Sequence, residues 1–490
     1  MEERNVILPG SPRYQPKKLQ PFFGYDNLYR EAVEVELATL YTLAEIGVIS
    51  EGVIKKLTPE ITEELLSIAT TEVDRVEREI TKHDIRALVR IIQKILIEKD
   101  APELAQWVHI PLTSYDPLDT GRILQFRKAY ERALKPSLEE VVLILAELTR
   151  RFAGQIQIGR THGRHALPIT VGFWLATILN RIINNWQQMD DASKNLVGKI
   201  SGAVGAHNAQ IAMKFNVGEE TFEERVLKKL GLKPAPISTQ ILPPEPLVYF
   251  LFSCTMMSAT FGQFGRDGRN LMRNEIGEIA EAFEEEQVGS STMAHKRNPI
   301  NFENLEGMWL RTKSEFGKVL DTLTSEHQRD LTGSSVIRDF PIIVVNLQQQ
   351  MNTLLRKNKA GVPFLKRLTV DSSACARNFK TSAKVILAEP LYIALQMAGF
   401  EGDGHEFVNR KLVPMAQRGK ISLKKAAEFV AQSDEKLARA ISNVPPDVWR
   451  LLGQPQKYLG DAKEKALEIA DEAESFIKSL HYAEQADDLY

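Results

Sequence analysis

Apolar residues recur at helical spacing along most of the chain. Between residues 302 and 323, the apolar side chains follow one another in steps of three, four and seven positions, which is the period of an amphipathic helix. The segments 28–46 and 462–480 show the same pattern, with charged residues between the apolar ones. Convincing alternation of apolar and polar residues, as in strands separated by regular turns, is missing. The pattern predicts an all-α protein.

Three of the predicted helices are unusually long and should cover residues 137–151, 168–189 and 246–283. Such lengths favour a bundle whose long helices share one core. The third helix starts with twenty residues, 246–265, that carry no charge, and a membrane-spanning helix needs about that length. Serine, threonine and glutamine interrupt this stretch and Arg266 follows it directly, so we expect a helix buried inside the bundle.

Two polar or Pro/Gly-containing segments suggest domain boundaries. One starts after residue 112 with the sequence TSYDP, and the other, the loop KAGVP, ends just before residue 365. We therefore expect three mostly helical domains around a long central helical bundle. They are an N-terminal domain of residues 1–112, a central long-helix domain of residues 113–365 and a C-terminal helical domain of residues 366–490.

Composition and charge exclude several classes of protein. The 490 residues include 62 Lys+Arg and 64 Asp+Glu, and this balance argues against binding to nucleic acid or to anionic membranes. The first residues lack the apolar core of a signal peptide. Two cysteines, Cys254 and Cys375, are too few for a disulfide framework, and neither lies in a CxxC metal pattern. We expect a cytoplasmic protein with no nucleic-acid or membrane partner.

Three polar, glycine-containing segments lie between strong helices. The longest, residues 287–298, exceeds the usual length of a connection in a helical bundle, which suggests a functional loop. It carries Lys296 and ends where Asn298 is expected to cap a helix that begins at Pro299. The alternative is an ordinary basic surface loop.

The other two segments combine basic side chains with hydroxyl or imidazole groups. Residues 159–168 contain His162 and His165 without a nearby carboxylate or cysteine, so they favour an anion over a metal. The alternative is that His162 is a capping or buried, hydrogen-bonded ring. Residues 327–338 place a Gly-Ser-Ser turn between two arginines, a composition that suits a phosphate monoester. The alternative there is a helix-capping turn flanked by solvated charges.

Two shorter segments are typical of helix starts. In residues 81–84 an acidic residue follows a threonine by three positions, which predicts a capping box and leaves His83 as a weaker binding candidate. In residues 113–117 the Asp-Pro pair is expected to supply the N-cap and the first helical residue. Thr113 and Ser114 then remain free to donate hydrogen bonds.

These segments together resemble a known family. Residues 289–299, GSSTMAHKRNP, closely resemble the GSSxMPxKxNP motif of the fumarase/aspartase superfamily, whose members eliminate fumarate from succinyl compounds. The resemblance continues in order through the other segments and covers residues from about 9 to 340. Within the superfamily the chain resembles the adenylosuccinate lyase family, chiefly through SPRY at residues 11–14, KHD at residues 82–84 and the arginine-rich residues 328–338.

The resemblance implies a fold, an assembly and a reaction. The fold would be three helical domains with a long central bundle, in a homotetramer whose active sites take residues from more than one subunit. The reaction would be β-elimination of fumarate from adenylosuccinate to give AMP, and from the succinylated aminoimidazole carboxamide ribotide SAICAR to give AICAR, in purine nucleotide biosynthesis. Neither a metal nor an organic cofactor would be needed.

The resemblance also assigns roles to residues. Ser290 would be the general base and His162 the general acid. A neutral serine is a poor base, so Ser290 would act as an oxyanion stabilised by nearby donors, including Lys296. The succinyl carboxylates would be held by Lys296, Asn298, Thr113 and Ser114. The nucleotide and its phosphate would be bound by Arg13, Tyr14, His83, Asp84, Gln240, Arg329, Ser334 and Arg338, with Ser335 beside them.

Two residues depart from the family pattern. Ala294 stands where the motif usually has proline, and Arg164 stands where glutamine is common. Arg164 and Arg160 would then join the other basic residues around one polyanionic substrate. Argininosuccinate lyase and carboxymuconate cycloisomerase are alternatives that would share Ser290 and Lys296, but their substrates carry no phosphate. A non-catalytic structural homologue is a further alternative.

Overall fold

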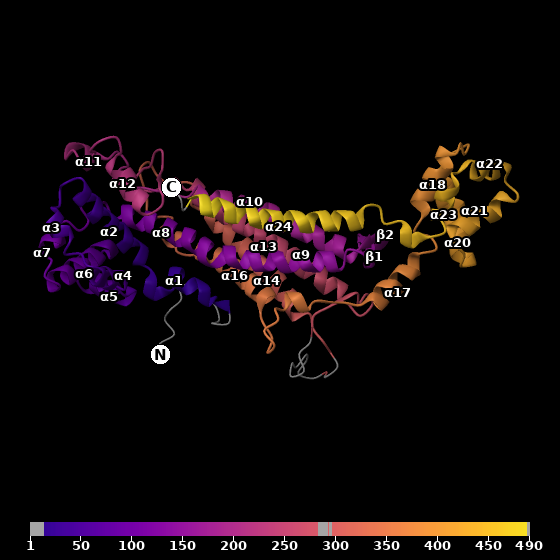
Figure 1. Cartoon of the computed structure of the whole chain (residues 1–490), viewed down its shortest axis with the longest axis horizontal. Helices are drawn as coiled ribbons and strands as arrows, with labels where there is room; N and C mark the ends of the chain where they lie inside the picture. Colours follow the sequence, from indigo (N-terminus) through magenta and orange to yellow (C-terminus); the bar gives the residue numbers. More distant parts are fainter. Residues whose placement is uncertain (1–13, 283–292, 294–295, 488–490) are drawn as a thin grey trace. The chain divides into compact units, whose positions relative to one another are not determined.

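The computed structural model describes residues 14–282, 293 and 296–487, and helices dominate this part of the chain (Figure 1). The chain divides into two compact units. Unit 1 comprises the described residues of Met1–Glu139, Asn184–Gly262 and Asn304–Thr353, and unit 2 those of Glu140–Ile183, Gln263–Glu303 and Leu354–Tyr490. The prediction of an all-α protein is confirmed. The division into three domains stays a prediction.

Five long helices contribute residues to both units. They are α9 (Lys135–Arg151), α10 (Val171–Lys194), α13 (Glu245–Leu271), α14 (Ile300–Asp321) and α16 (Pro341–Leu355). Unit 1 also holds α1 (Gln20–Phe23), α2 (Arg30–Glu45), α3 (Glu51–Ile54), α4 (Pro59–Leu66), α5 (Thr70–Val76), α6 (Asp84–Glu98), α7 (Pro102–Ala105), α8 (Tyr115–Ala129), α11 (Asn208–Ala212), α12 (Phe222–Lys229) and α15 (Ser334–Ile337), with the paired two-residue strands β3 (Val197–Gly198) and β4 (Lys233–Pro234).

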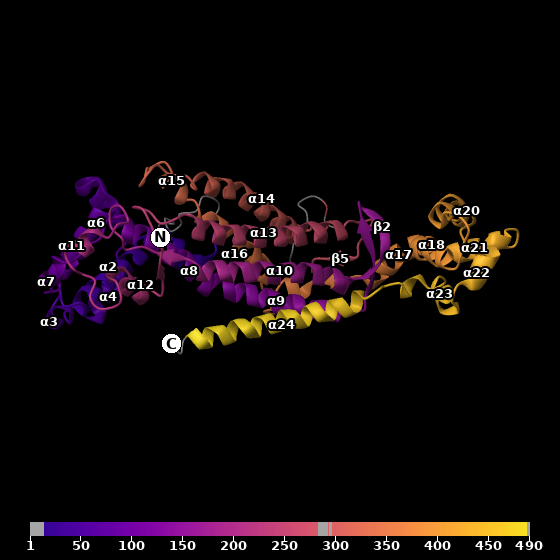
Figure 2. The same ribbon diagram turned by 90° about the horizontal axis from the view of Figure 1, so that it is seen from above.

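Unit 2 contains the remaining described α-helices and strands. They are β1 (Ile156–Thr161), β2 (Arg164–Thr170), β5 (Ile279–Ala280), β6 (Thr369–Val370), α17 (Ser372–Ser382), α18 (Ala388–Met397), α19 (Gly404–Phe407), α20 (Val413–Gly419), α21 (Leu423–Ala431), α22 (Glu435–Asn443), α23 (Pro446–Leu451) and α24 (Ala462–Asp487). Helices α18 to α23 gather around their own apolar core (Figure 1). Helix α24 runs beside α9 and α10, where Arg150 of α9 donates a 2.7 Å hydrogen bond to Asp471 (Figures 1 and 2).

The helices predicted from periodicity are present, with two corrections. Residues 28–46, 137–151, 302–323 and 462–480 correspond to α2, α9, α14 and α24. The helix predicted for residues 168–189 begins only at Val171, because residues 156–170 form the antiparallel hairpin β1–β2. The helix predicted for residues 246–283 ends at Leu271. Turns follow, Gly277 adopts a φ of +62°, and the Glu278 amide bonds back to the Leu271 carbonyl.

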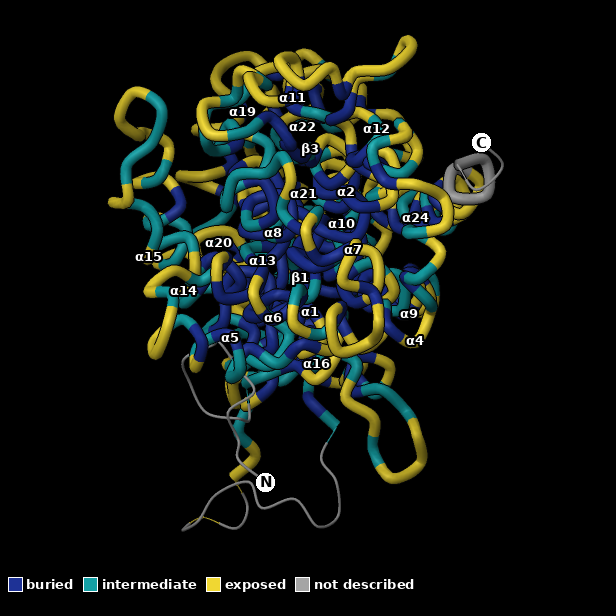
Figure 3. Tube along the Cα trace, turned by 90° about the vertical axis from the view of Figure 1, so that its left-hand side faces the viewer, coloured by how far each residue is buried: buried dark blue, intermediate teal, exposed yellow. Residues whose placement is uncertain are grey.

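The core of unit 1 forms where α2 packs against α8. Gly121 of α8 permits this contact, since a Cβ there would lie only 3.0 Å from the backbone nitrogen of Ala32. An aromatic cluster extends the core, with the Phe126 ring 5.2 Å from that of Phe23 and 6.3 Å from that of Phe250. Long stretches of α2, α8 and α13 are accordingly buried (Figure 3). The close packing fixes the start of α8, which carries candidate binding residues.

Helix α13 contains the long uncharged stretch. Among the described helices it is the one that could cross a membrane by length and composition alone. However, 67% of its most apolar window is buried inside the protein, which is typical of a core helix.

Glu31 gives the α2–α8 contact a pH dependence. The residue is 2% exposed, and within the described structure its Oε2 atom has no hydrogen-bond partner. Burial raises the pKa of Glu31 from 4.5 to about 7, although Lys128, 3.6 Å away, acts in the opposite direction. The folded protein therefore keeps a proton that the unfolded chain loses, and this contribution to stability disappears as the pH rises from about 4.5 through about 7.

Glu31→Gln is therefore expected to stabilise the protein above pH 7 and to have little effect near pH 4.5. A pKa shift of this size corresponds to about 3 kcal/mol in the free energy of unfolding at pH 8. Urea unfolding of both proteins across this pH range provides the measurement. A Gln variant that is less stable than the parent at pH 8 would contradict the assignment.

Candidate active site

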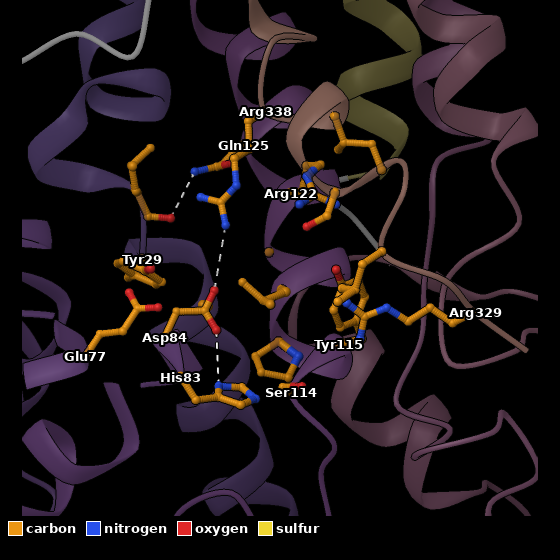
Figure 4. Close-up of a pocket in the computed structure, with 18 of the residues that line it drawn as sticks. Tyr29, Glu77, His83, Asp84, Ser114, Tyr115, Arg122, Gln125, Arg329 and Arg338 are labelled. Atoms are coloured by element: carbon orange, nitrogen blue, oxygen red, sulfur yellow. Dashed lines mark hydrogen bonds and ion pairs between the residues drawn. The ribbon is translucent and has the colours of Figure 1, made fainter. Parts of the chain in front are cut away.

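Unit 1 contains a pocket of about 540 Å³, a volume suited to a small-molecule ligand (Figure 4). Its walls come from α2, α6, α8 and the segment that follows α14. Six of the residues predicted to bind substrate lie in its lining, namely His83, Asp84, Ser114, Arg329, Ser334 and Arg338. Residues from four distant parts of the sequence thus meet in one cavity.

The start of α6 supplies His83 and Asp84. His83 is the N-cap, and its Nδ1 lies 3.2 Å from Asp84 Oδ1. The predicted capping box is wrong, because Thr81 ends a preceding π-helical turn and Lys82 adopts a left-handed φ of 54°. As a result, α6 begins one residue after His83, which leaves the imidazole at the pocket surface.

Acidic and basic groups face each other across the pocket. The Arg338 Nη2 atom lies 3.9 Å from Asp84 Oδ2 (Figure 4). Burial, and then the charge of Asp84, raise the pKa of Glu77 and the pKa of the Tyr29 hydroxyl. The carboxylates can accept hydrogen bonds from ligand hydroxyl or amino groups, whereas the arginines can pair with an anion.

Arg329 is held in place before any ligand binds. Its guanidinium lies 3.5 Å from the centre of the Tyr115 ring and donates a 3.0 Å hydrogen bond to Gln240 Oε1. The neighbouring Asp330 shapes this loop by accepting backbone hydrogen bonds from Glu326 and Thr332, which hold its pKa well below the usual range. Gln240, which is not part of the lining, is thereby linked to the pocket.

Thr113 and Ser114 precede α8, and a buried ion pair holds this segment. The helix begins at Tyr115 with Ser114 as its N-cap residue, so the prediction of Asp116 as N-cap and Pro117 as first helical residue is wrong. Asp116 instead lies in the first turn, where Oδ2 accepts a 2.8 Å hydrogen bond from the Thr113 amide. Its Oδ1 lies 2.5 Å from the Nζ of Lys199, and the two side chains are 1% and 0% exposed.

The segment 159–168 is a β-hairpin in unit 2. His162 and Gly163 form its turn with φ values of 52° and 72°, and this strand pair was not predicted. The turn leaves His162 exposed, which excludes the alternative of a buried ring. Arg160 does not add a free charge to a substrate pocket, because it pairs with Glu278 at 2.7 Å.

Lys296 and Asn298 lie just before α14, also in unit 2. Lys296 is exposed and Asn298 is partly buried. The helix begins at Ile300, one residue later than predicted, and Glu281 caps it by accepting 2.9 Å hydrogen bonds from the amides of Asn301 and Phe302. The cap therefore comes from a carboxylate twenty positions upstream, which local sequence does not indicate.

Several predicted residues are not part of the pocket lining. Arg13, Ser290 and Ala294 lie outside the described residues. The described residues Tyr14, Thr113 and Ser335 do not line the pocket. Conversely, sequence reasoning missed the lining residues Tyr29, Glu77, Tyr115, Arg122 and Gln125. The spacing of Tyr115, Arg122 and Gln125 on one face of α8 is the signal that could have found three of them.

A family model and curated relatives both match this chain to lyases. Residues 26–312 match a family model described as Lyase. A relative from Pyrococcus horikoshii named adenylosuccinate lyase is 32% identical over 96% of this chain and 99% of its own length. A Bacillus subtilis protein with the same name is 31% identical over 78% of this chain and 83% of its own length.

Solved structures share the fold. The 3-carboxy-cis,cis-muconate lactonizing enzyme from Pseudomonas putida has a TM-score of 0.76 at 21% identity, and the match covers 95% of this chain and 98% of that one. Fumarate lyase from Mesorhizobium sp. BNC1 has a TM-score of 0.75 at 22% identity, with 94% of this chain and all of the other covered. At these identities the likeness shows the fold alone.

Proposed function

The chain belongs to the adenylosuccinate lyase family of lyases, and on that premise we propose that it cleaves adenylosuccinate to AMP and fumarate. The observation that carries the proposal is the pocket of unit 1, where six residues of the family pattern converge. A phosphate-bearing substrate accounts for Arg329, Ser334 and Arg338 together. We extend the proposal to SAICAR, which carries the same succinylamino group and a ribose phosphate.

The pocket chemistry suits a mononucleotide. Arginine pairs with phosphate oxygens in a bidentate geometry, and Arg329 is already oriented by Tyr115 and Gln240. Asp84 and Glu77 can accept hydrogen bonds from ribose hydroxyls or from amino groups of a base. Argininosuccinate has neither a phosphate nor a ribose, so it leaves these groups without a role.

Elimination needs a base at one carbon and an acid at the neighbouring nitrogen. We assign the acid to His162, whose exposed position in the hairpin turn leaves the imidazole accessible to a substrate. Its imidazolium would protonate the departing nitrogen. The base is Ser290, on the strength of the sequence motif alone. Lys296 and Asn298 would bind the succinyl carboxylates with Thr113 and Ser114 and stabilise the negative charge that develops when the proton leaves.

An exposed apolar stripe on α13 and α14 supports a homo-oligomer. Tyr249 and Phe252 of α13 are 63% and 46% exposed, and Leu310 and Leu320 of α14 are each 50% exposed. Exposed apolar side chains at helical spacing fit burial against another helix, so we propose a homotetramer in which subunits share active sites. Light scattering should then give about 221 kDa, four times the 55.3 kDa of one chain. A 55.3 kDa particle would contradict it.

We also propose a cytoplasmic location.

Replacing Arg338 tests the nucleotide pocket. Arg338→Gln is expected to weaken AMP binding about 10-fold or more, because a hydrogen bond to a charged group contributes about 1.5–3 kcal/mol. Isothermal titration calorimetry gives the dissociation constant. The side chain of Arg338 is 62% exposed, so its loss should not disturb folding.

Two controls make this test specific. Arg90→Gln removes an exposed arginine of α6 outside the pocket lining and should leave AMP binding unchanged. Adenosine, which lacks the phosphate, should bind the parent and Arg338→Gln proteins equally. If Arg338→Gln weakened adenosine and AMP by the same factor, Arg338 would have no role at the phosphate.

A further inference from the structure

Glu278 is a fully buried carboxylate where several elements of unit 2 meet. It lies just before β5, and its side chain is 0% exposed. Oε1 accepts hydrogen bonds of 2.7 Å from Arg160 and 2.8 Å from Asn378. Oε2 accepts hydrogen bonds of 2.9 Å from Arg160 and 2.9 Å from Gln157. Each oxygen thus has two donors, and the negative charge is matched by one guanidinium.

Two of these three partners lie on the hairpin that carries His162. Gln157 and Arg160 both belong to β1, and Arg160 stands two positions before the turn. Residues three apart on a regular strand point to opposite faces. The β1–β2 pairing shifts register between Ile158 and Arg160, an irregularity that increases local twist, and both side chains reach the same carboxylate.

The backbone around Glu278 is itself fixed. Its amide donates to the Leu271 carbonyl at the end of α13, and its carbonyl accepts a 3.0 Å hydrogen bond from the amide of Asp371. Three positions further on, Glu281 caps the start of α14. The segment 278–281 therefore anchors the hairpin at one end and, at the other, the helix that follows Lys296 and Asn298.

We propose that Glu278 is a positioning residue for His162, because it holds the hairpin turn at a fixed position relative to the start of α14. Two parallel hydrogen bonds form the fork between the Arg160 guanidinium and the Glu278 carboxylate. Together they fix the direction of β1 and its rotation about the strand axis, which a single hydrogen bond could not do. This inference rests on the proposed function for its kinetic consequence, but the placement of the hairpin can be measured without substrate.

Glu278→Gln keeps the side-chain size and removes the charge. The amide nitrogen of the new glutamine would face N–H donors, so it cannot accept a hydrogen bond and the two-point pairing with Arg160 is lost. We expect kcat to fall about 100-fold, the scale of a misplaced catalytic group, with the KM for adenylosuccinate changed less than about 3-fold. The rate is expressed per AMP-binding site from calorimetry, so a smaller folded fraction cannot mimic the effect.

Asn378→Leu is the matched control. Asn378 donates to the same carboxylate from α17, and its replacement should lower thermal stability while leaving kcat per site unchanged. If Glu278→Gln does not fold because Arg160 is left unpaired, Gln157→Leu replaces it. That variant removes one hairpin donor, keeps the ion pair, and should lower kcat about 10-fold, a smaller displacement than loss of the fork.

Hydrogen exchange of residues 156–170 gives the substrate-free measurement. These amides should exchange at least about 10-fold faster in Glu278→Gln, or in Gln157→Leu, than in Asn378→Leu, as expected for local opening. Equal exchange in the two kinds of variant, or an unchanged kcat per site in the hairpin variants, would overturn the proposal. If the parent protein fails to cleave adenylosuccinate, the proposed function falls, and the exchange rates alone decide the role of Glu278.

Discussion

Replacing His162 with alanine is expected to lower the kcat for adenylosuccinate by about 10²–10⁴-fold, the usual contribution of a positioned acid. The loss should be confined to the chemical step. His162 belongs to unit 2, whereas every residue lining the proposed nucleotide pocket belongs to unit 1. AMP should therefore bind the variant with the affinity of the parent protein.

His165→Ala is the matched control for this prediction. His165 lies on the same hairpin, its Nδ1 is 2.8 Å from Ser382 Oγ, and burial followed by Arg160 lowers its pKa. Neither property suits an acid that must carry a proton, and the variant should keep near-normal turnover. Stopped-flow or steady-state absorbance assays measure both rates. If His162→Ala retained more than about a tenth of the parent activity, His162 would not be the acid.

The second large effect is expected for the buried ion pair between Asp116 and Lys199, beside the start of α8. Asp116→Ala should lower the free energy of unfolding by about 3–5 kcal/mol, because Lys199 would remain buried without a counter-charge. The amides of Thr113 and Gly202 would also lose their acceptor. Urea unfolding gives this difference, and calorimetry reports whether the adjacent pocket still binds AMP.

Two further variants distinguish the loss of the ion pair from other causes of destabilisation. Asp116→Leu combined with Lys199→Met removes both charges and should be more stable than Asp116→Ala, since no unpaired charge remains. Glu51→Gln breaks the exposed pair with Lys55 and should leave the unfolding midpoint unchanged. A loss below about 1 kcal/mol in Asp116→Ala would show that the pair does not stabilise the fold.

The sequence predicts the long helices well because each carries an apolar stripe over many turns. The hairpin β1–β2 was missed because its strands are too short to carry such a repeating pattern. Its strands are six and seven residues long, and its turn is His162–Gly163 in place of the more common Asn-Gly. The end of α13 was missed because apolar residues continue at helical spacing beyond it, at Met272, Ile276, Ile279 and Ala280.

The site was predictable as far as motifs extend. His83, Ser114, Arg329 and Arg338 stand in short segments with recognisable patterns, and they meet in one pocket. Long-range pairings gave no such signal. The carboxylate of Asp116 and the amine of Lys199 are 83 positions apart, and Glu278 reaches β1 from 118 positions away, so only the folded chain relates them.

The most direct test of the account is turnover of adenylosuccinate by the purified protein. The absorbance of adenylosuccinate should fall, with AMP and fumarate appearing in equal amounts, while argininosuccinate and carboxymuconate remain unchanged in parallel assays. Stoichiometric AMP and fumarate would support the proposed reaction. No release of fumarate from adenylosuccinate, or faster release from argininosuccinate, would contradict it.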